Sequence, residues 1–521
     1  MKRFNITGKC IPEQHYMVDI SERIGRIKQM VDAGDYVCIN RGRQYGKTTT
    51  LSLLKRNLDK EYAVFSLSLE SVGDAELQTD ETLASALLWM LNQKIKTNQV
   101  SSLSPDAIKY MSEVSPEVPS SISTLVFGAV ISSFCRQNEK PVVLLIDEVD
   151  QASNYSSFIK LLGVLREKYL NRDNEPTFKS VILSGVYDIK NIKLKLRPDE
   201  QHKTNSPWNI AVPFDEDMSL SAKGIKGMLD NYETDHQTGM DTTFISTFLY
   251  DYTAGYPFLV ERLCMLMDES GNWTKDGFLE ATKRLLNDDN TLFKDISKKL
   301  EDFPDLSNMI YRMLFMGEEF PYNPQNKSQE LGKLFNLIDE KDGKVIISNR
   351  LLETWFYNLF FTNERLKNET YNSGANSKPE FIKDGCLNME LILERFTQLY
   401  DTLYDSSRDE KFDEEEGRKK FLFYIKPIIN GVGNFYVEAR TRNMRRTDLV
   451  IDYLGKQYVV EMKIWYGDQY NTAGEEQLAD YLDALRLEKG YMLTFNFNKS
   501  RKKKEAVRKT IRGKKLIEYI A

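Results

Sequence analysis

Histidine is scarce in this chain, with three residues in 521, too few for a metal site built on imidazole ligands. The five cysteines are odd in number and far apart, and no C-x-x-C pair occurs. That pattern argues against a zinc ribbon or a disulfide framework.

No apolar run approaches the roughly 20 residues of a membrane-spanning helix. Residues 1–11 lack the apolar core of a secretory signal. We therefore expect a reducing, cytoplasmic setting and no membrane partner.

Strong net charge is also missing. The net charge is −6, which gives no global sign of a nucleic-acid-binding protein. No helicase motif and no array of aromatic base-stacking motifs is present, which argues against a translocase. The length predicts three or four domains.

The first 215 residues alternate between short β-rich runs and helical stretches. Helical patterns between these runs include Leu83–Lys96 and Ser157–Leu170. Alternation of this kind predicts a parallel sheet covered on both faces, as in doubly wound α/β proteins. The five predicted strands are Tyr36–Asn40, Ala63–Leu69, Val142–Ile146, Ser180–Ser184 and Asn209–Pro213.

The pattern changes after residue 217. Residues 218–300 read as helices only and form a helical lid, and residues 301–365 give two helices and a short β-ribbon, the order of a winged-helix segment. Residues 366–380 are rich in Asn, Ser, Gly and Pro and are interpreted as a linker. The last predicted domain, residues 381–521, begins with helices and continues with strands.

The sequence "NRGRQYGKTTT" at 40–50 ends like a phosphate-binding loop. A predicted strand precedes it and a predicted helix follows, which is the context that the motif requires. Backbone N–H groups of Gly46 and the next residues, together with the helix dipole, would hold phosphate. Lys47 would reach the β- and γ-phosphates, and Thr48 would bind Mg²⁺, with Thr49 also at the nucleotide. An ordinary Gly-containing turn is the alternative for this loop taken alone.

A second strand supports a nucleotide site. "PVVLLIDEVD" at 141–150 is a buried apolar run that ends in Asp147 and Glu148. Acids at the carboxyl end of a parallel strand lie where a doubly wound sheet binds its ligand. Asp147 would hold Mg²⁺ through water, and Glu148 would polarise the attacking water. Ser184 at the end of the fourth strand can sense the γ-phosphate or cap a turn. Pro257, opening a lid helix, can pack on adenine or simply start that helix.

These motifs, with "YMVDISERI" and "SPWNIAVPF", resemble the AAA-ATPase-like family of bacterial proteins, whose loop reads approximately R-P-R-R-F-G-K-[ST]. Gly42 replaces the proline and Gln44 the second arginine. The missing first glycine, where Arg41 stands, is then a trait of the family. The resemblance covers about 1–300 and implies a P-loop fold of the ASCE type with a helical lid. Arg43 either contacts phosphate or holds the loop against acidic neighbours.

The sequence "RTDLVIDYLGKQYVVEMKIW" at 446–465 indicates a second candidate catalytic site. Two strands flank a predicted Gly455-Lys456 turn, which would set Asp448 opposite Lys463 and diagonal to Glu461. Asp448 and Glu461 can bind Mg²⁺ or Mn²⁺, with the main-chain carbonyl of Met462 as a further ligand. Lys463 can orient water beside the metal. The alternative is a solvated hairpin face with an ion pair.

The spacing Asp-x12-Glu-x-Lys, followed by a helix with Gln477 and Tyr481, resembles the PD-(D/E)XK nuclease superfamily over roughly 390–500. Gln477-x-x-x-Tyr481 resembles the Q-x-x-x-Y of its exonuclease-like branches, where it lies near DNA. Thr447 stands where a proline often precedes the first acid. Glu416 is a candidate first-helix glutamate.

The stretch 499–515 has ten Lys or Arg residues against one Glu, which indicates contact with a phosphate backbone or a solvated basic helix. We therefore expect an ATP-binding and ATP-hydrolysing module joined to an α/β restriction-endonuclease-like nuclease domain that acts on nucleic acid, with DNA favoured. A homo-oligomer is left open. The rival hypothesis is a signalling or scaffolding NTPase whose last domain only binds nucleic acid.

Overall fold

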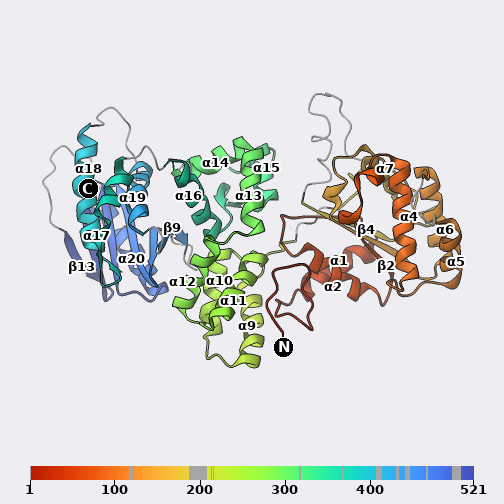
Figure 1. Cartoon of the computed structure of the whole chain (residues 1–521), viewed down its shortest axis with the longest axis horizontal. Coiled ribbons are helices and arrows are strands. Elements are labelled where there is room, and N and C mark those ends of the chain that lie inside the picture. Colours follow the sequence, from red (N-terminus) through yellow and green to blue (C-terminus); the bar gives the residue numbers. More distant parts are fainter. Residues whose placement is uncertain are drawn as a thin grey trace. The chain divides into compact units, whose positions relative to one another are not determined.

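The computed structural model divides into two compact units. The first comprises Met1–Ser219 and Leu334–Asn336, and the second comprises Leu220–Lys333 and Leu337–Ala521. Figure 1 labels many of the helices and strands of the two units. None of the described helices is long and apolar enough to cross a bilayer. The structure describes residues 2–115, 121–186, 208–212, 214, 216–315, 318–364, 369–406, 414–429, 433–440, 446–464, 468–495 and 506–521.

The first unit is built on a four-stranded parallel sheet with the order β1-β4-β3-β2. Its strands are β1 (Val37–Asn40), β2 (Ala63–Ser68), β3 (Val142–Asp147) and β4 (Ser180–Gly185). The strands are apolar at almost every position because both faces of the sheet are covered. The helices of this unit are α1 (Ser21–Ala33), α2 (Lys47–Leu58), α3 (Asp74–Leu77), α4 (Asp80–Lys96), α5 (Pro105–Val114), α6 (Thr124–Gln137) and α7 (Ser156–Leu170).

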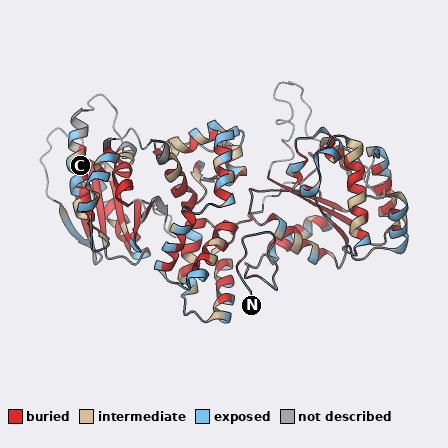
Figure 2. Cartoon of the chain, in the orientation of Figure 1, coloured by how far each residue is buried: buried red, intermediate tan, exposed pale blue. Residues whose placement is uncertain are grey.

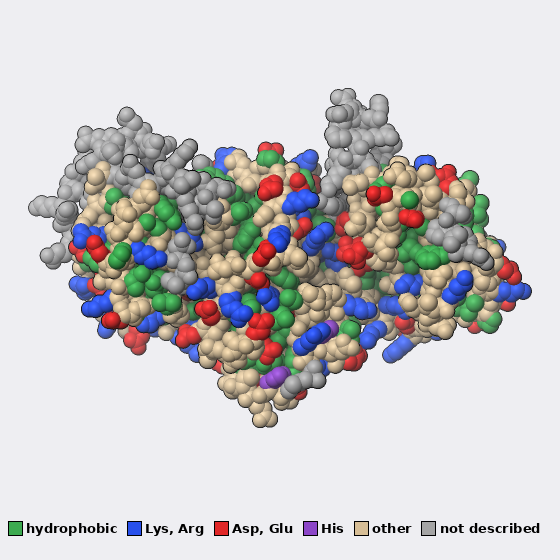
Figure 3. Space-filling model, in the orientation of Figure 1, with side chains coloured by type: hydrophobic (Ala, Val, Ile, Leu, Met, Phe, Trp, Pro, Cys, Tyr) green, Lys and Arg blue, Asp and Glu red, His purple; other side chains and the backbone are tan. Residues whose placement is uncertain are grey.

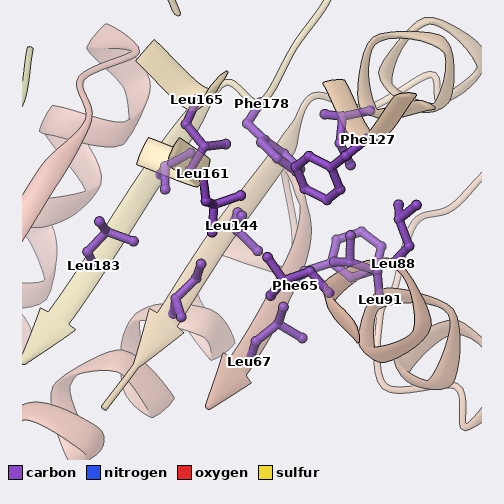
Figure 4. Packing of buried hydrophobic residues seen from close by; sticks show 14 of the residues in the cluster. Phe65, Leu67, Leu88, Leu91, Phe127, Leu144, Leu161, Leu165, Phe178 and Leu183 are labelled. Carbon is purple, nitrogen blue, oxygen red and sulfur yellow. The ribbon is translucent and has the colours of Figure 1, made fainter. Parts of the chain in front are cut away.

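Two apolar clusters cover the two faces of this sheet. Helices α1 and α2 supply the smaller cluster, and α4, α6 and α7 supply the larger one. Figure 4 shows the larger cluster, in which Phe65 and Leu144 of the sheet meet Leu88, Phe127 and Leu161 of the helices. The expected doubly wound arrangement is therefore confirmed for this unit.

The predicted fifth strand, Asn209–Pro213, is not a strand in the described residues. Residues Trp208–Ile210 form a turn, and only Val212 pairs with the sheet, through an isolated bridge to Val37. The Val212 N–H donates to the carbonyl of Tyr36 at 2.8 Å. Proline has no N–H to donate, so a ladder is hard to extend at residue 213. Pro213 itself lies outside the described residues.

The second unit begins with helices, as expected for a lid and a following helical segment. Two helices and a hairpin occur in the expected order over residues 304–347, which is the segment interpreted as winged-helix. The elements are α9 (Ala222–His236), α10 (Thr242–Thr253), α11 (Pro257–Ser270), α12 (Lys275–Leu286), α13 (Thr291–Asp302), α14 (Pro304–Phe315), α15 (Lys327–Leu334), β5 (Ile338–Lys341), β6 (Lys344–Ile347) and α16 (Arg350–Glu364).

The interpretation of residues 366–380 as a linker is wrong for the part that the structure describes. Residues Glu369–Phe381 form helix α17, which packs closely on helix α19 (Glu414–Ile429). A Cβ added at Gly374 would lie 2.1 Å from the carbonyl oxygen of Tyr424, so glycine is what permits this contact. A composition typical of a linker was overridden by tertiary packing.

The chain ends in a mixed six-stranded sheet with the order β13-β14-β12-β11-β10-β9. Figure 2 shows its central strands as buried. Helix α20 covers one face, where Leu478 and Leu482 meet Gly490, and α19 covers the other, where Gly417 meets Phe495. The elements are β7 (Ile382–Lys383), β8 (Cys386–Leu387), α18 (Met389–Ser406), α19 (Glu414–Ile429), β9 (Gly433–Arg440), β10 (Arg446–Tyr453), β11 (Lys456–Ile464), α20 (Asp468–Ala484), β12 (Lys489–Phe495), β13 (Val507–Ile511) and β14 (Lys514–Ile520).

Candidate functional site

The loop between β1 and α2 has the form that a phosphate site requires. Gly46 stands at the N-cap of α2 with φ 81°, in the left-handed region that glycine adopts without strain. A Cβ at Gly46 would meet no atom within 4 Å, so open space lies beside the helix N-terminus. The first N–H groups of a helix and its dipole favour an anion in such a position.

Lys47, the first residue of α2, is folded back over the loop. Its ammonium group donates to the carbonyls of Arg41 at 2.9 Å and Gly42 at 3.0 Å. The side chain is buried at 6 % exposure. The cation is thus held inside the loop, where a phosphate oxygen would compete with two carbonyl oxygens for it.

Thr48 and Asp147 come together from α2 and β3. The Thr48 hydroxyl donates to the Asp147 carboxylate at 2.7 Å. The other carboxylate oxygen accepts the N–H of Glu148 at 3.0 Å. A hydroxyl and a carboxylate in contact are oxygen ligands of the type that Mg²⁺ prefers. These two residues therefore fit the role of metal ligands.

Glu148 follows β3 in a left-handed conformation with φ 54°. Such a conformation costs a non-glycine residue energy and is common at functional sites. Burial raises the pKa of its carboxyl group, and the charges of Lys47 and Arg43 act in the opposite direction. Glu148 therefore lies close enough to the loop for the charges of Lys47 and Arg43 to act on its carboxyl group. Its left-handed conformation could not be predicted from the sequence.

The strand order places β4 between β1 and β3, so Ser184 ends its strand beside both functional strands. Its side chain is fully buried, and its hydroxyl has no hydrogen-bond partner in the described residues. Sequence reasoning missed Asp150, whose carboxylate accepts the Val186 N–H at 2.5 Å just after this strand. A Cβ at Gly185 would lie 3.1 Å from the same carboxylate.

The two arginines of the loop differ in their contacts. Arg41, in place of the usual first glycine, donates to the carbonyl of Glu216 at 2.7 Å and lies over the ring of Phe214. Arg43 is exposed. Arg41 thus ties the loop to the segment that ends the first unit, by a contact to a backbone carbonyl that a sequence pattern does not reveal.

Thr49 and Pro257 are two further residues that the sequence predicted to contact the nucleotide. The Thr49 hydroxyl accepts the N–H of Cys10 at 3.0 Å, which joins α2 to the N-terminal segment. Pro257 is the first residue of α11 and belongs to the second unit. Its contact with adenine, and a contact of Thr49 with nucleotide, stay predictions.

The hairpin of β10 and β11 has a different register from the expected one. Tyr453 pairs with Lys456 and Leu449 with Val460, so the two-residue turn is Leu454-Gly455. Both turn residues have positive φ, 48° and 78°, as a type I′ turn requires. Continuing this register by one residue sets position 448 opposite Glu461 and not Lys463. The expectation for Lys463 was wrong because Leu454, a non-glycine residue, occupies a left-handed position.

Glu461 and Lys463 lie on the face of the sheet that α20 covers. Their charged groups are 3.2 Å apart, and Glu461 is fully buried. A Cβ at Gly474 of α20 would lie 3.4 Å from the Lys463 side chain, so the helix packs directly over it. Met462 is fully buried on the opposite face, which leaves only its carbonyl for the predicted ligand role.

Asp448 itself is described only in its backbone. Within the part of the chain that the structure describes, no group of three His, Cys, Asp or Glu side chains is placed to hold a metal ion. The side chain of Glu416 likewise lies outside the described residues, in α19. The metal ligands of the last domain therefore stay predictions.

Gln477 and Tyr481 lie one helical turn apart on α20. Gln477 is half-buried, whereas Tyr481 is 2 % exposed. Burial raises the pKa of the Tyr481 phenol to about 12. Tyr481 lines a cavity of about 270 Å³ together with Tyr252 and Arg350, which belong to helices α10 and α16. Tyr481 is thus directed toward the helical part of this unit.

The basic stretch 499–515 is only partly described, and residues 506–515 form β13 and the start of β14, not a helix. Most of its described cations make ion pairs within the domain. Lys509 pairs with Glu475, Arg512 with Glu476, and Lys514 with Asp483. Figure 3 shows Lys and Arg side chains interspersed with Asp and Glu on the face in view. The expected phosphate contacts of Arg501 to Lys504 lie outside the described residues.

A comparison with protein families finds one family that matches the greater part of the chain. Residues 16–358 match the AAA-like domain family, about two thirds of the sequence. The chain belongs to the AAA-like domain family. The match extends beyond the expected limit near residue 300 and includes the loop, the strand that ends in Asp147 and the helices interpreted as a lid. An ATPase fold with a parallel sheet is therefore established, whereas the nuclease assignment of the last domain is not covered by this match.

Similar solved structures exist at low sequence identity. The Walker-type ATPase of Pyrococcus abyssi has 13 % identity and a TM-score of 0.48, and the match covers 68 % of this chain and 99 % of that one. The Aeropyrum pernix ORC1 protein in complex with DNA has 10 % identity and a TM-score of 0.31, covering 67 % and 95 %. At such values these likenesses carry no argument about function. The comparison with curated proteins finds no match.

Proposed function

We propose that the protein binds and hydrolyses ATP and carries a metal-dependent nuclease domain, with the ATP state controlling cleavage of nucleic acid. The observation that carries the first part is the hydrogen bond of Thr48 to Asp147, beside Lys47 and an open helix N-terminus. Membership of the AAA-like domain family supports the same assignment.

In the ATPase site, the side chains have distinct roles. Lys47 leaves its two loop carbonyls and binds the phosphates, an exchange that a doubly charged phosphate favours over neutral acceptors. Thr48 and Asp147 would hold Mg²⁺, which supplies neutralisation of phosphate charge when bound. Glu148 accepts a proton from the attacking water. Its raised pKa makes it a better base than an exposed glutamate.

In the last domain, the proposal rests on Glu461 and Lys463. A fully buried carboxylate lowers the stability of the fold unless it is paired with a cation or serves a function. The Glu461 carboxylate is fully buried, and the ammonium group of Lys463 contacts it. Asp448, Glu461 and the Met462 carbonyl would hold Mg²⁺ or Mn²⁺, which supplies an acidified water. Lys463 orients that water, and Gln477 and Tyr481 belong to the helix that covers the pair. DNA is the proposed substrate. A cytoplasmic location and a homo-oligomeric state remain predictions.

A cleavage assay on the purified full chain tests this function. Linear duplex DNA, single-stranded DNA and RNA are incubated with and without Mg²⁺ or Mn²⁺, each with and without ATP. We expect metal-dependent cleavage of DNA that changes when ATP is added. Metal-independent cleavage would instead indicate a contaminating or different activity.

The rival hypothesis is an NTPase whose last domain only binds nucleic acid. The ion pairs of Lys509, Arg512 and Lys514 do not distinguish the two hypotheses, because both require nucleic-acid binding and these cations are occupied within the domain. ATP hydrolysis together with DNA binding and no cleavage under any metal condition would support this rival.

A further inference from the structure

Helix α10 in the second unit presents three aromatic rings in a row. Phe244, Phe248 and Tyr252 follow one another at intervals of four residues, about one helical turn, so they lie on one face of the helix. The centres of neighbouring rings lie 4.6 and 6.1 Å apart. Phe278 of α12 packs edge-to-face against Phe248 and Tyr252, with 5.4 and 4.9 Å between the ring centres. The packing of two helices therefore fixes this row of rings.

A cation from another part of the second unit lies against each ring of this row. The distances from the charged group to the ring centre are 4.4 Å for Arg486 and Phe244, 5.9 Å for Lys275 and Phe248, and 4.1 Å for Arg350 and Tyr252. The face of an aromatic ring attracts a cation, and the attraction is stronger where water is excluded. The row of rings therefore gathers three positive charges.

The three cations differ in their access to solvent. Arg350 is buried, and the Lys275 ammonium group donates to the Leu485 carbonyl at 3.1 Å. Burial lowers the pKa of Lys275, and the charge of Asp452 acts in the opposite direction. Arg486, by contrast, is exposed, and its side chain forms no ion pair or hydrogen bond with the residues that the structure describes. An anion from solution can therefore reach Arg486.

The cavity of about 270 Å³ lies beside the row of rings, and every residue that lines it belongs to the second unit. An aromatic interior with a few polar groups at the mouth is typical of a site for a small molecule. The volume is close to the lower end of the range for such sites, roughly 300 Å³, so the cavity suits one ring system with larger substituents at the mouth. The buried lining residues are Phe248, Tyr252, Arg350, Tyr481 and Leu485. The exposed lining residues are Asp241, Thr243, Asp251, Ala484 and Arg486.

The charges at the mouth define the ligand further. Arg486 attracts an anion, and a guanidinium group can donate two parallel hydrogen bonds to a phosphate or a carboxylate. Asp241 and Asp251 contribute two carboxylates, and that of Asp241 also accepts the Phe244 N–H at 2.9 Å. Carboxylates repel an anion, so a ligand that suits this mouth also carries hydrogen-bond donors. A nucleoside monophosphate combines a flat base, sugar hydroxyl donors and a phosphate, whereas a simple aromatic carboxylate lacks the donors.

We propose that this cavity binds a nucleoside monophosphate, with the base against the buried rings, the sugar hydroxyls toward Asp251 and the phosphate at Arg486. The site is separate from the phosphate loop, because none of its lining residues belongs to the first unit. Asp448, Glu461 and Lys463 do not line it either. The proposal therefore depends on neither the proposed ATPase activity nor the proposed nuclease activity.

Isothermal titration calorimetry of the full chain with AMP, GMP, CMP and UMP tests this site. We expect at least one of the four to bind with one-to-one stoichiometry. The matching nucleoside and inorganic phosphate, titrated separately, should each bind at least about tenfold more weakly, because each lacks one set of contacts. Lys47→Ala should bind the monophosphate as the wild type does, since Lys47 lies in the first unit.

Two substitutions at the mouth test the assignment of the cavity. Arg486→Gln removes the charge and should weaken binding by about 10- to 100-fold, the factor for loss of a hydrogen bond from a charged donor. Ala484→Trp fills the mouth and should prevent detectable binding. Both positions are exposed, so the fold should tolerate the changes, and thermal unfolding verifies this.

Arg284→Gln is the matched control, because Arg284 is an exposed arginine of α12 that pairs with Glu269 and does not line the cavity. It should bind the monophosphate as the wild type does. Failure of all four nucleotides to bind at millimolar concentration overturns the proposal, and so does wild-type affinity in both mouth variants. Binding that is lost in Lys47→Ala and kept in Arg486→Gln would assign the nucleotide to the phosphate loop instead. Benzoate binding as tightly as the best nucleotide would refute the ligand class.

Discussion

Replacement of Lys47 by alanine is the substitution whose effect on nucleotide binding can be worked out most fully. In the wild type, the buried ammonium group has two carbonyl partners, at 2.9 and 3.0 Å, within a loop at a helix N-terminus. Removing it takes the only buried cation of the loop away from the phosphates. Each charged hydrogen bond contributes about 1.5–3 kcal/mol, so two such bonds to phosphate correspond to a loss of at least about 100-fold in affinity.

Thermal or denaturant unfolding with and without ATP and Mg²⁺ measures this effect. At a nucleotide concentration of about 100 times the wild-type Kd, binding stabilises the wild type by about 2.7 kcal/mol. With a Kd raised 100-fold or more, the same concentration stabilises Lys47→Ala by about 0.4 kcal/mol or less. Lys55→Ala is the control, since Lys55 lies on the same helix and pairs with Asp59. If Lys47→Ala were stabilised as much as the control, the phosphate assignment would be refuted.

Three further predictions concern other parts of the chain. Glu148→Gln should bind ATP and hydrolyse it about 10²–10⁴-fold more slowly in a phosphate-release assay, because the base is lost. Since burial raises the pKa of this carboxyl, its stabilising contribution is complete below the unfolded-state pKa and is lost as the pH rises through the folded-state pKa. Glu148→Gln should therefore melt higher than the wild type at neutral pH, and a lower melting temperature would contradict this. Gly374→Val should destabilise the second unit by about 1–3 kcal/mol in urea unfolding, because its Cβ overlaps the Tyr424 carbonyl, and an unchanged midpoint would refute the packing of α17. Alanine at Arg501, Lys502, Lys503 and Lys504 should flatten the log–log salt slope of DNA binding by roughly 2–4, with Arg512→Ala, whose cation pairs with Glu476, as the control. An unchanged slope would exclude phosphate contacts by these four residues.

Local patterns predicted the first unit well. The loop before α2, the apolar strand before Asp147 and the neighbouring position of Ser184 follow from strand and helix periodicity, which acts over a few residues. The prediction of a fifth strand was wrong for the described residues, because Trp208–Ile210 form a turn and only Val212 pairs with the sheet. The hydrogen bond from Arg41 to the Glu216 carbonyl could not be predicted from a local pattern, because the acceptor is a backbone atom 175 residues away in the sequence.

The second unit shows where sequence reasoning was limited. Leu454 adopts a left-handed conformation that the turn prediction assigned to other residues, and the register changed with it. The stretch at 369–381, which contains Asn, Ser, Gly and Pro, is helical, and Gly374 permits its close packing on α19. The basic residues of β13 and β14 are paired with acids of α20, a tertiary arrangement that composition cannot indicate.

The most direct test of the two-site account measures ATP hydrolysis and DNA cleavage on one preparation of Lys463→Ala. Lys463 lies beside buried Glu461 in the second unit, and Lys47 lies in the first, so the two activities should separate. Lys456→Ala, on the same strand at its exposed turn end, is the matched control. We expect Lys463→Ala to lose metal-dependent cleavage and keep wild-type ATP hydrolysis, and Lys456→Ala to keep both. Cleavage retained by Lys463→Ala at the level of the control would contradict the nuclease assignment.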